Sequence, residues 1–225
     1  MKTHYVGHDD MYKKFKAGDE QQDWSTPKQV AEYLPVLKRS LARDYIPKSG
    51  RFLEMGCGAG TYSLWFAKKG YQVYGVDIAP TAIAWAKEKA KKQKIIANFR
   101  VGSVLDLAEF KDNFFDFVLD GHCLHCIIGK DRNAFLKSAL RVLRPGGFFR
   151  VATMCGEVTN DEWIKDFDPK SRCMVIKDIA RRYIGLADDI LDEIKDAGFK
   201  IKRWRILYRK DKYEQDDLLV DTIKP

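Results

Sequence analysis

The sequence predicts an α/β fold: a doubly wound, mostly parallel seven-stranded sheet with a C-terminal antiparallel hairpin and helices on both faces. Apolar runs of strand length alternate with segments of helical periodicity along most of the chain, as is typical of a parallel sheet covered by helices. A glycine-rich turn follows the first apolar run, and the last two runs lie close enough to pair as a hairpin. A length of 225 residues is ordinary for one such domain.

The elements follow in order along the chain. Residues 23–46 are expected to form a helical lead-in, because Pro27 suits a first helical turn and apolar residues recur at helical spacing. Gly70 is placed to end the next helix, and Pro80 to open another. The strands expected in the first two thirds of the chain are 51–55, 71–76, 98–101, 115–120 and 148–154, and the helices are 61–69, 80–93 and 131–143.

The last third of the chain is expected to complete the sheet. Residues 144–147, with the sequence Arg-Pro-Gly-Gly, predict a turn before the fifth strand. Residues 155–185 form an irregular stretch that is longer than a usual connection. A helix at 187–197 and strands at 199–208 and 218–223 follow, with a charged connection short enough for an antiparallel hairpin.

Composition and charge narrow the kind of protein. The apolar runs are far shorter than the roughly 20 residues that a membrane helix needs, so we expect no membrane span. Five scattered cysteines do not suggest a disulfide framework, and a cytoplasmic location fits them better. The formal net charge is +8. Many of the lysines lie on the helix expected at 80–93, which favours a solvated helix face over a nucleic-acid partner.

The glycine-rich turn after the first strand is the strongest sign of a ligand site. Gly56, Gly58 and Gly60 allow a sharp turn and close approach of a ligand, at the edge where open α/β sheets bind ligands. Asp77 ends the next strand, where a carboxylate accepts hydrogen bonds from ribose hydroxyls. The carboxylate of Glu54 repels a pyrophosphate but suits a ligand with cationic groups. This charge argues against a nicotinamide-dependent dehydrogenase.

These residues resemble the motifs of a known family. The pattern Glu54-x-Gly56-x-Gly58-x-Gly60 is similar to the first motif of class I S-adenosylmethionine-dependent methyltransferases, and Asp77 to their acidic second motif. The resemblance is dense over residues 50–155 and implies a Rossmann-like domain of the small-molecule type. Further segments similar to the family's motifs are 102–104, 115–120 and 143–147.

The resemblance implies S-adenosylmethionine as the cofactor and gives several residues a role. Glu54 and the backbone of the glycines hold the methionine end, and Asp77 binds the ribose. Ile78 and Val104 enclose the adenine, with the hydroxyl of Ser103 as a polar contact. The residues implied to bind the cofactor are Glu54, Gly56, Cys57, Gly58, Asp77, Ile78, Ser103, Val104 and Asp120.

The loop after the fourth strand faces the methyl group in this fold and has the unusual sequence Asp-Gly-His-Cys-Leu-His-Cys over residues 120–126. By the resemblance, Asp120 lies near the amino group of the cofactor. His122 or His125 is the candidate catalytic residue, as a general base or by orienting the acceptor. The alternatives are a zinc site, which four adjacent ligands form poorly, so that no metal is expected, and small buried cysteines beside a hydrogen-bonded core histidine.

Two segments are expected to close the acceptor side. The helical lead-in or lid covers residues 1–46, and a substrate-side insertion at about 155–185 interrupts the methyltransferase domain of residues 47–225. Long insertions in compact domains often form lids or binding loops. Arg172 is a candidate partner for an anionic substrate group, with a surface salt bridge as an equal alternative. The large side chains noted in the two segments are Tyr5, Tyr12, Phe15, Trp24, Trp163, Phe167, Met174 and Tyr183.

We therefore expect S-adenosylmethionine-dependent transfer of a methyl group to a small-molecule O, N or S acceptor by in-line displacement. That reaction needs aligned reactants and exclusion of water. RNA or protein methylation is an alternative that the positive charge encourages, although the Asn/Asp-Pro-Pro-aromatic sequence common in nucleic-acid amino-methyltransferases is absent after the fourth strand. A cofactor-binding regulator without transferase activity is a further alternative. The sequence indicates neither the acceptor nor an oligomeric state.

Overall fold

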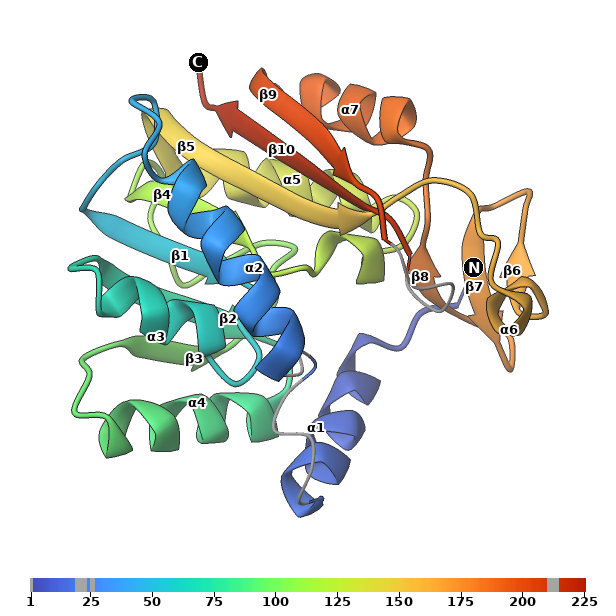
Figure 1. Ribbon diagram of the computed structural model, residues 1–225, viewed down its shortest axis with the longest axis horizontal. Coiled ribbons are helices and arrows are strands. Elements are labelled where there is room, and N and C mark those ends of the chain that lie inside the picture. Colours follow the sequence, from blue (N-terminus) through green and yellow to red (C-terminus); the bar gives the residue numbers. More distant parts are fainter. Residues whose placement is uncertain (1, 19–23, 25–26, 210–214) are drawn as a thin grey trace.

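A seven-stranded sheet with the strand order β3-β2-β1-β4-β5-β10-β9 forms the centre of the computed structural model (Figure 1). The structure describes residues 2–18, 24, 27–209 and 215–225. Only β10 runs antiparallel to its neighbours among these seven strands, so the predicted fold class and the terminal hairpin are confirmed. The strands are β1 (Arg51–Met55), β2 (Gln72–Asp77), β3 (Asn98–Val101), β4 (Phe115–Asp120), β5 (Leu143–Met154), β9 (Lys200–Leu207) and β10 (Asp217–Ile223).

Helices cover both faces of this sheet, because successive residues of a strand point to opposite sides. Phe52 of β1 packs in a core cluster with Leu37 of α2, whereas the next residue, Leu53, packs in another cluster with Phe135 of α5. Figure 1 shows α2 in front of the sheet and α5 behind it. The covering helices are α2 (Pro27–Ser40), α3 (Thr61–Ala67), α4 (Pro80–Lys92), α5 (Asp131–Val142) and α7 (Ala187–Asp196).

The carboxyl ends of β1, β2 and β4 are joined by backbone hydrogen bonds around the glycine-rich turn. The amide of Gly56 donates to the carbonyl of Val76 at 2.8 Å, and the amide of Gly121 donates to the carbonyl of Met55 at 2.8 Å. Gly56 has a φ of +70°, and a Cβ atom there would lie 2.6 Å from the Cβ of Cys123. Glycine is therefore required where the turn passes the loop after β4.

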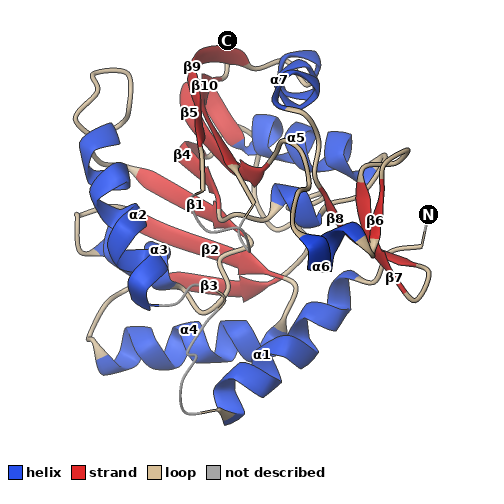
Figure 2. Cartoon of the chain, turned by 45° about the vertical axis from the view of Figure 1, so that its right-hand side comes forward, coloured by secondary structure: helices blue, strands red, loops and turns tan. Residues whose placement is uncertain are grey.

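The N-terminal segment differs from the expected lead-in. A 3-10 turn (Tyr5–Gly7) and a helix, α1 (His8–Ala17), precede α2, which ends at Ser40; residues 23 and 25–26 of the expected helix lie outside the described residues. Helix α1 is fastened to α4, since Asp9 Oδ1 accepts a hydrogen bond from the Thr81 amide at 2.7 Å. Figure 2 shows α1 and α4 side by side below the β3 edge of the sheet.

The insertion is a small three-stranded antiparallel sheet, so the expectation of an irregular stretch is wrong. Two consecutive residues at the turn between its last two strands, Lys177 and Asp178, have φ angles of +50° and +61°, the backbone of a tight hairpin turn. Lys-Asp is not a common sequence for this turn, which explains why it escaped detection. The elements are α6 (Asp161–Ile164), β6 (Phe167–Asp168), β7 (Cys173–Ile176) and β8 (Ile179–Tyr183).

The predicted turn at residues 144–147 lies inside β5, where it forms an irregularity in the pairing with β4. Phe115 pairs with Leu143, but Phe117 pairs with Phe148, so the Arg-Pro-Gly-Gly segment is extra length on one strand. Such a bulge uses the same residues as a turn, because Gly146 has a φ of +72°. The strand therefore begins five residues before the predicted start.

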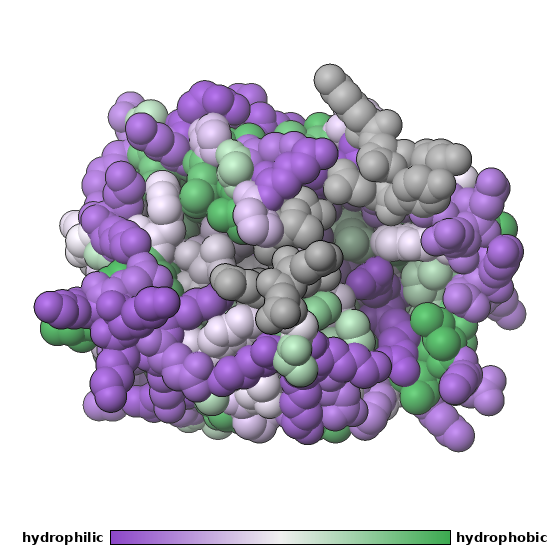
Figure 3. All heavy atoms as spheres, turned by 60° about the horizontal axis from the view of Figure 1, so that its bottom comes forward, coloured by the Kyte–Doolittle hydropathy of each residue, from purple (hydrophilic) through white to green (hydrophobic). Residues whose placement is uncertain are grey.

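The outer surface carries the charge that the composition predicts. The face turned forward in Figure 3 is mostly hydrophilic, with apolar groups in small patches. Among the described residues, no helix has the length and apolar character needed to cross a membrane.

Candidate functional site

A cavity of about 600 Å³ opens at the carboxyl ends of β1, β2 and β4. This volume falls in the range of roughly 300–1,000 Å³ that is typical of small-molecule sites. All the residues implied to bind the cofactor line the cavity, together with both candidate catalytic histidines, so the structure brings the whole predicted set together. They are Glu54, Gly56, Cys57, Gly58, Asp77, Ile78, Ser103, Val104, Asp120, His122 and His125.

Two carboxylates from neighbouring strands stand at the glycine-rich turn. Asp77 is 7% exposed and accepts hydrogen bonds from the amides of Gly58 at 2.8 Å and Ala79 at 2.9 Å. Glu54 is 2% exposed and accepts a hydrogen bond from the hydroxyl of Ser63 at 2.5 Å. Buried carboxylates at the edge of a cavity favour a ligand with hydrogen-bond donors or positive charge.

The amide groups of the glycine-rich turn are engaged within the protein. Gly56 donates to a β2 carbonyl and Gly58 donates to Asp77, so the turn offers close approach and carbonyl oxygens to a ligand. On the opposite side, Ser103 Oγ accepts from the Leu105 amide at 3.1 Å, as in a local turn. The carbonyl of Val104 is fixed by the hydroxyl of Ser138 at 2.6 Å.

Asp120, at the end of β4, is fully buried and positions the loop that follows. Its Oδ1 accepts hydrogen bonds from the amides of Cys123 at 2.7 Å and Leu124 at 3.1 Å. Burial raises the pKa of Asp120 to about 6, although these backbone hydrogen bonds and the charge of His122 act in the opposite direction. This carboxyl group therefore changes charge near neutral pH.

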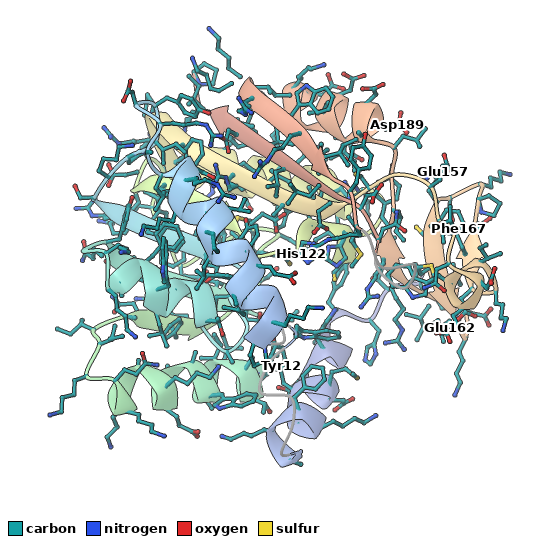
Figure 4. All side chains as sticks on the ribbon, in the orientation of Figure 1. Tyr12, His122, Glu157, Glu162, Phe167 and Asp189 are labelled. Atoms are coloured by element: carbon teal, nitrogen blue, oxygen red, sulfur yellow. The ribbon has the colours of Figure 1, made fainter. Side chains whose placement is uncertain are left out.

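His122 is held by a residue from the far end of the chain. Its Nε2 lies 2.8 Å from Oδ1 of Asp217 at the start of β10, and Arg209 forms an ion pair with the other oxygen of Asp217. Burial lowers the pKa of His122, but the charge and hydrogen bond of Asp217 outweigh it and raise this pKa above 6.5. The backbone of His122 is left-handed, with a φ of +62°. Figure 4 shows His122 in the middle of the molecule, between α2 and the strand ends.

His125 has the opposite electrostatic environment. It is 4% exposed on a 3-10 turn (Leu124–Cys126), and its ring centroid lies 4.5 Å from that of His122. Burial lowers the pKa of His125 well below 6.5, and the positive charges of His122 and Arg182 act in the same direction. Among the described side chains and backbone groups, none forms a hydrogen bond with the buried Nδ1 of His125. A neutral imidazole thus lines the cavity, with its Nδ1 buried.

The neighbouring cysteines are thiols. Burial raises the pKa of Cys123 well above its usual value and the pKa of Cys126 to about 11, which disfavours the thiolate that redox or zinc chemistry requires. Within the described part of the chain, no group of three or more His, Cys, Asp or Glu side chains is placed to hold a metal ion.

Of the large side chains noted in the two lid segments, some line the cavity and others do not. Arg172 does not, because its guanidinium donates to the carbonyls of Ile184 at 2.8 Å and Gly156 at 2.6 Å and pairs with Glu157 at 3.6 Å. Figure 4 shows Phe167 on the small sheet and Glu157 on the loop that leads to it, both away from His122. The structure thus favours the salt bridge over a substrate contact for Arg172. The noted residues that line the cavity are Tyr5, Tyr12, Trp24 and Trp163.

Sequence analysis missed the polar residues that reach the cavity from the C-terminal third. Asp217 lies 95 residues from His122 in the chain, and no local pattern links the two. Arg182 follows another arginine on a strand that was not predicted. The missed polar cavity residues from this third are Arg182, Arg209, Gln215 and Asp217.

A sheet of this order with an acidic ligand site at its carboxyl edge is the framework of class I S-adenosylmethionine-dependent methyltransferases, and residues 53–151 belong to that class. This segment matches the family model described as a methyltransferase domain. Similar curated proteins are ubiquinone biosynthesis O-methyltransferases. The one from Xanthomonas oryzae pv. oryzae is 33% identical over 104 residues, covering 46% of this chain and 43% of that protein. The one from Rhodopseudomonas palustris is 35% identical over 104 residues, covering 46% and 39%. The chain thus matches less than half the length of these relatives.

Solved structures share the fold over most of the chain. An S-adenosylmethionine-dependent methyltransferase from Methanosarcina mazei aligns with a TM-score of 0.70 and 23% identity, covering 84% of this chain and 97% of the other. The cyclase SpnF aligns with a TM-score of 0.73 and 19% identity, covering 100% and 97%. Since a protein named as a cyclase has this fold, the reaction has to be argued from the site.

Proposed function

We propose that this protein transfers a methyl group from S-adenosylmethionine to a small-molecule O, N or S acceptor by in-line displacement. The observation that carries the proposal is one continuous cavity with two chemically different ends. Buried carboxylates and the glycine-rich turn form one end, and a neutral histidine with aromatic side chains forms the other. This division suits a cationic cofactor beside a nucleophile that has to lose a proton.

The residues at the first end fit the cofactor. In our proposal Glu54 and the carbonyl oxygens of the turn accept hydrogen bonds from its ammonium group, with Asp120 nearby, and Asp77 accepts from the ribose hydroxyls. Cys57, which also lines the cavity, is proposed to contact the cofactor within the turn. When bound, S-adenosylmethionine supplies a methyl group made electrophilic by the sulfonium charge. The residues proposed to surround the adenine are Ile78, Ser103 and Val104.

At the second end, His125 is the proposed general base. A base has to be neutral at the working pH, and the lowered pKa of His125 keeps it so. Asp217 raises the pKa of His122, and we propose that His122 positions His125 and the acceptor. The N-terminal residues 1–46 and the insertion at about 155–185 are proposed to close over the acceptor, because Tyr5, Tyr12 and Trp163 line the cavity from these segments. Closure excludes water from the displacement.

The experiment is calorimetric titration of the protein with S-adenosylmethionine, S-adenosylhomocysteine and NAD. We expect the two adenosyl ligands to bind and NAD to bind weakly or not at all. Asp77→Ala is expected to lose most of this affinity, whereas Asp188→Ala, an exposed carboxylate on α7, is expected to keep it. If neither adenosyl ligand binds the wild-type protein, the proposal is wrong. If both bind but no acceptor is methylated in a screen, the protein is a cofactor-binding regulator instead.

A further inference from the structure

An arginine at the acceptor end of the cavity forms no ion pair with a carboxylate among the described residues. Arg182 lies on β8, is half-buried and lines the cavity. Its Cζ lies 5.3 Å from the centroid of the Trp163 ring. No carboxylate in the described ranges of the chain forms an ion pair with it. A guanidinium over an aromatic ring can still donate hydrogen bonds from the N–H groups at its edge.

The buried carboxylates around the same cavity are already engaged elsewhere. Asp217 pairs with His122 and Arg209. Asp120 accepts backbone hydrogen bonds, and the two carboxylates at the glycine-rich turn belong to the proposed cofactor end. Within the described part of the chain, the positive charge of Arg182 is therefore not balanced by an ion pair, and it lies over the ring of Trp163.

The charge of Arg182 acts on the loop that contains His125, the proposed base. Strand β8 packs against the 3-10 turn of His125, and the positive charge of Arg182 lowers the pKa of both His125 and Cys126, against the larger effect of burial for the cysteine. Because Arg182 is close to this loop, a ligand bound by Arg182 would also contact His125. His125 and Arg182 both line the cavity.

We infer that Arg182 binds an anionic group of the methyl acceptor, a carboxylate or a phosphate monoester, through the N–H groups at the edge of its guanidinium. Both groups present paired oxygens that match the fork of an arginine. Arg182 thereby selects acidic small molecules and sets the distance between their anionic group and the atom that receives the methyl group. This inference rests on the proposed function and names the class of its acceptor.

The test uses three simple probes of similar size: benzoate, its neutral methyl ester, and phenyl phosphate. Each is titrated calorimetrically into wild-type protein saturated with S-adenosylhomocysteine. We expect at least one anionic probe to bind about tenfold or more tightly than the ester, the effect of a charge-assisted hydrogen bond in a partly desolvated site. The stronger of the two anions distinguishes a carboxylate site from a phosphate site.

Variants test whether Arg182 causes the preference for an anion over the ester. Arg182→Gln is expected to abolish the difference between anion and ester, and Arg182→Lys to keep part of it. Arg181→Gln is the matched control, because Arg181 is the preceding residue of β8, is exposed and does not line the cavity. The inference is overturned if neither benzoate nor phenyl phosphate binds better than the ester, or if the preference for the anion is unchanged in Arg182→Gln. Intact S-adenosylhomocysteine binding in those cases leaves the proposed function standing, whereas its absence in the wild type contradicts that function.

Discussion

At the scale of single residues, two neighbouring histidines have pKa values shifted in opposite directions, that of His122 upward by Asp217 and that of His125 downward chiefly by burial. Asp217 stabilises the charged form of His122, and the charge of His122 in turn disfavours a proton on His125. Such an arrangement keeps a base neutral without removing it from hydrogen-bonding distance of a substrate. The difference in pKa between His122 and His125 depends on Asp217 of β10, so it does not arise from the two histidines alone.

Replacing that carboxylate is predicted to move both pKa values. In Asp217→Asn the pKa of His122 falls, since burial and Arg209 still lower it and only the smaller effect of Asp120 remains to raise it. The pKa of His125 rises, because a neutral His122 no longer repels its proton. NMR titration of the imidazole protons measures both values. Asp216→Asn, which changes the neighbouring residue, is the control, and unchanged histidine titrations in Asp217→Asn would contradict the coupling.

Removal of the proposed base is predicted to affect turnover and not cofactor affinity. With an identified acceptor, His125→Ala lowers kcat by about 100-fold or more, the usual contribution of a general base. His122→Ala has a smaller effect, because this residue acts through His125. S-adenosylhomocysteine binds both variants as it binds the wild type. The base assignment fails if His125→Ala retains wild-type turnover.

Asp120 is predicted to release a proton when the cofactor binds. Its pKa of about 6 means that much of it is protonated at pH 6, and a cationic ammonium group placed nearby lowers this pKa. Binding enthalpies of S-adenosylhomocysteine at pH 6 therefore differ between buffers of different ionisation enthalpy. The difference decreases in Asp120→Asn and persists in Asp116→Asn, at the other end of β4. Net proton uptake by the wild type would contradict the proposed position.

At the scale of elements, a buried arginine on α5 holds the 3-10 turn that carries His125. Nη1 of Arg132 donates to the carbonyls of Leu124 at 2.8 Å and Ile127 at 3.3 Å. The same guanidinium pairs with Glu193 of α7 at 2.6 Å. The turn has few backbone hydrogen bonds of its own, so two helices on one face of the sheet determine where the histidine stands.

Loss of this arginine is predicted to destabilise the fold and the site together. Arg132→Gln leaves buried carbonyls without donors and Glu193 without its ion-pair partner. We expect the free energy of unfolding to fall by about 2–4 kcal/mol. This loss is smaller than for a fully buried ion pair because Glu193 is partly exposed. Chemical denaturation measures it. Lys195→Gln removes the exposed pair with Asp192 and should leave stability unchanged; a loss there as large as in Arg132→Gln would contradict the assignment.

The elements also show what the sequence could predict. Strand and helix order followed from apolar periodicity, and the cofactor end followed because Glu54, the glycines and Asp77 lie in one short stretch joined by a single helix. The acceptor end could not be predicted, since it is assembled from distant segments. Asp217 meets His122 only through the insertion of β10 into the sheet, and β8 depends on a hairpin turn without glycine at Lys177 and Asp178.

At the scale of the whole molecule, the ligand is predicted to stabilise the fold as one unit. The cavity joins the central sheet, α1, α2 and the small insertion sheet. S-adenosylhomocysteine at 100 times its Kd adds about 2.7 kcal/mol, which for a chain of this size raises Tm by about 5–10 °C. Calorimetric scans should show one transition that moves as a whole, and Asp77→Ala should show almost no shift. A second unfolding transition whose temperature does not change with ligand would contradict unfolding as a single cooperative unit.

The order of the strands also has a consequence for how the protein is made. Because β9 is synthesised before β10, yet β10 lies between β5 and β9, the ribosome releases β9 while its neighbour in the final sheet does not yet exist. The nascent chain can form the edge that contains Glu54 and Asp77 early, since β1, β2 and β4 are already complete. Asp217 arrives with the last strand, and with it the partner of His122. The residues proposed to hold the cofactor are therefore synthesised before the residue that pairs with the histidine proposed to act in the reaction.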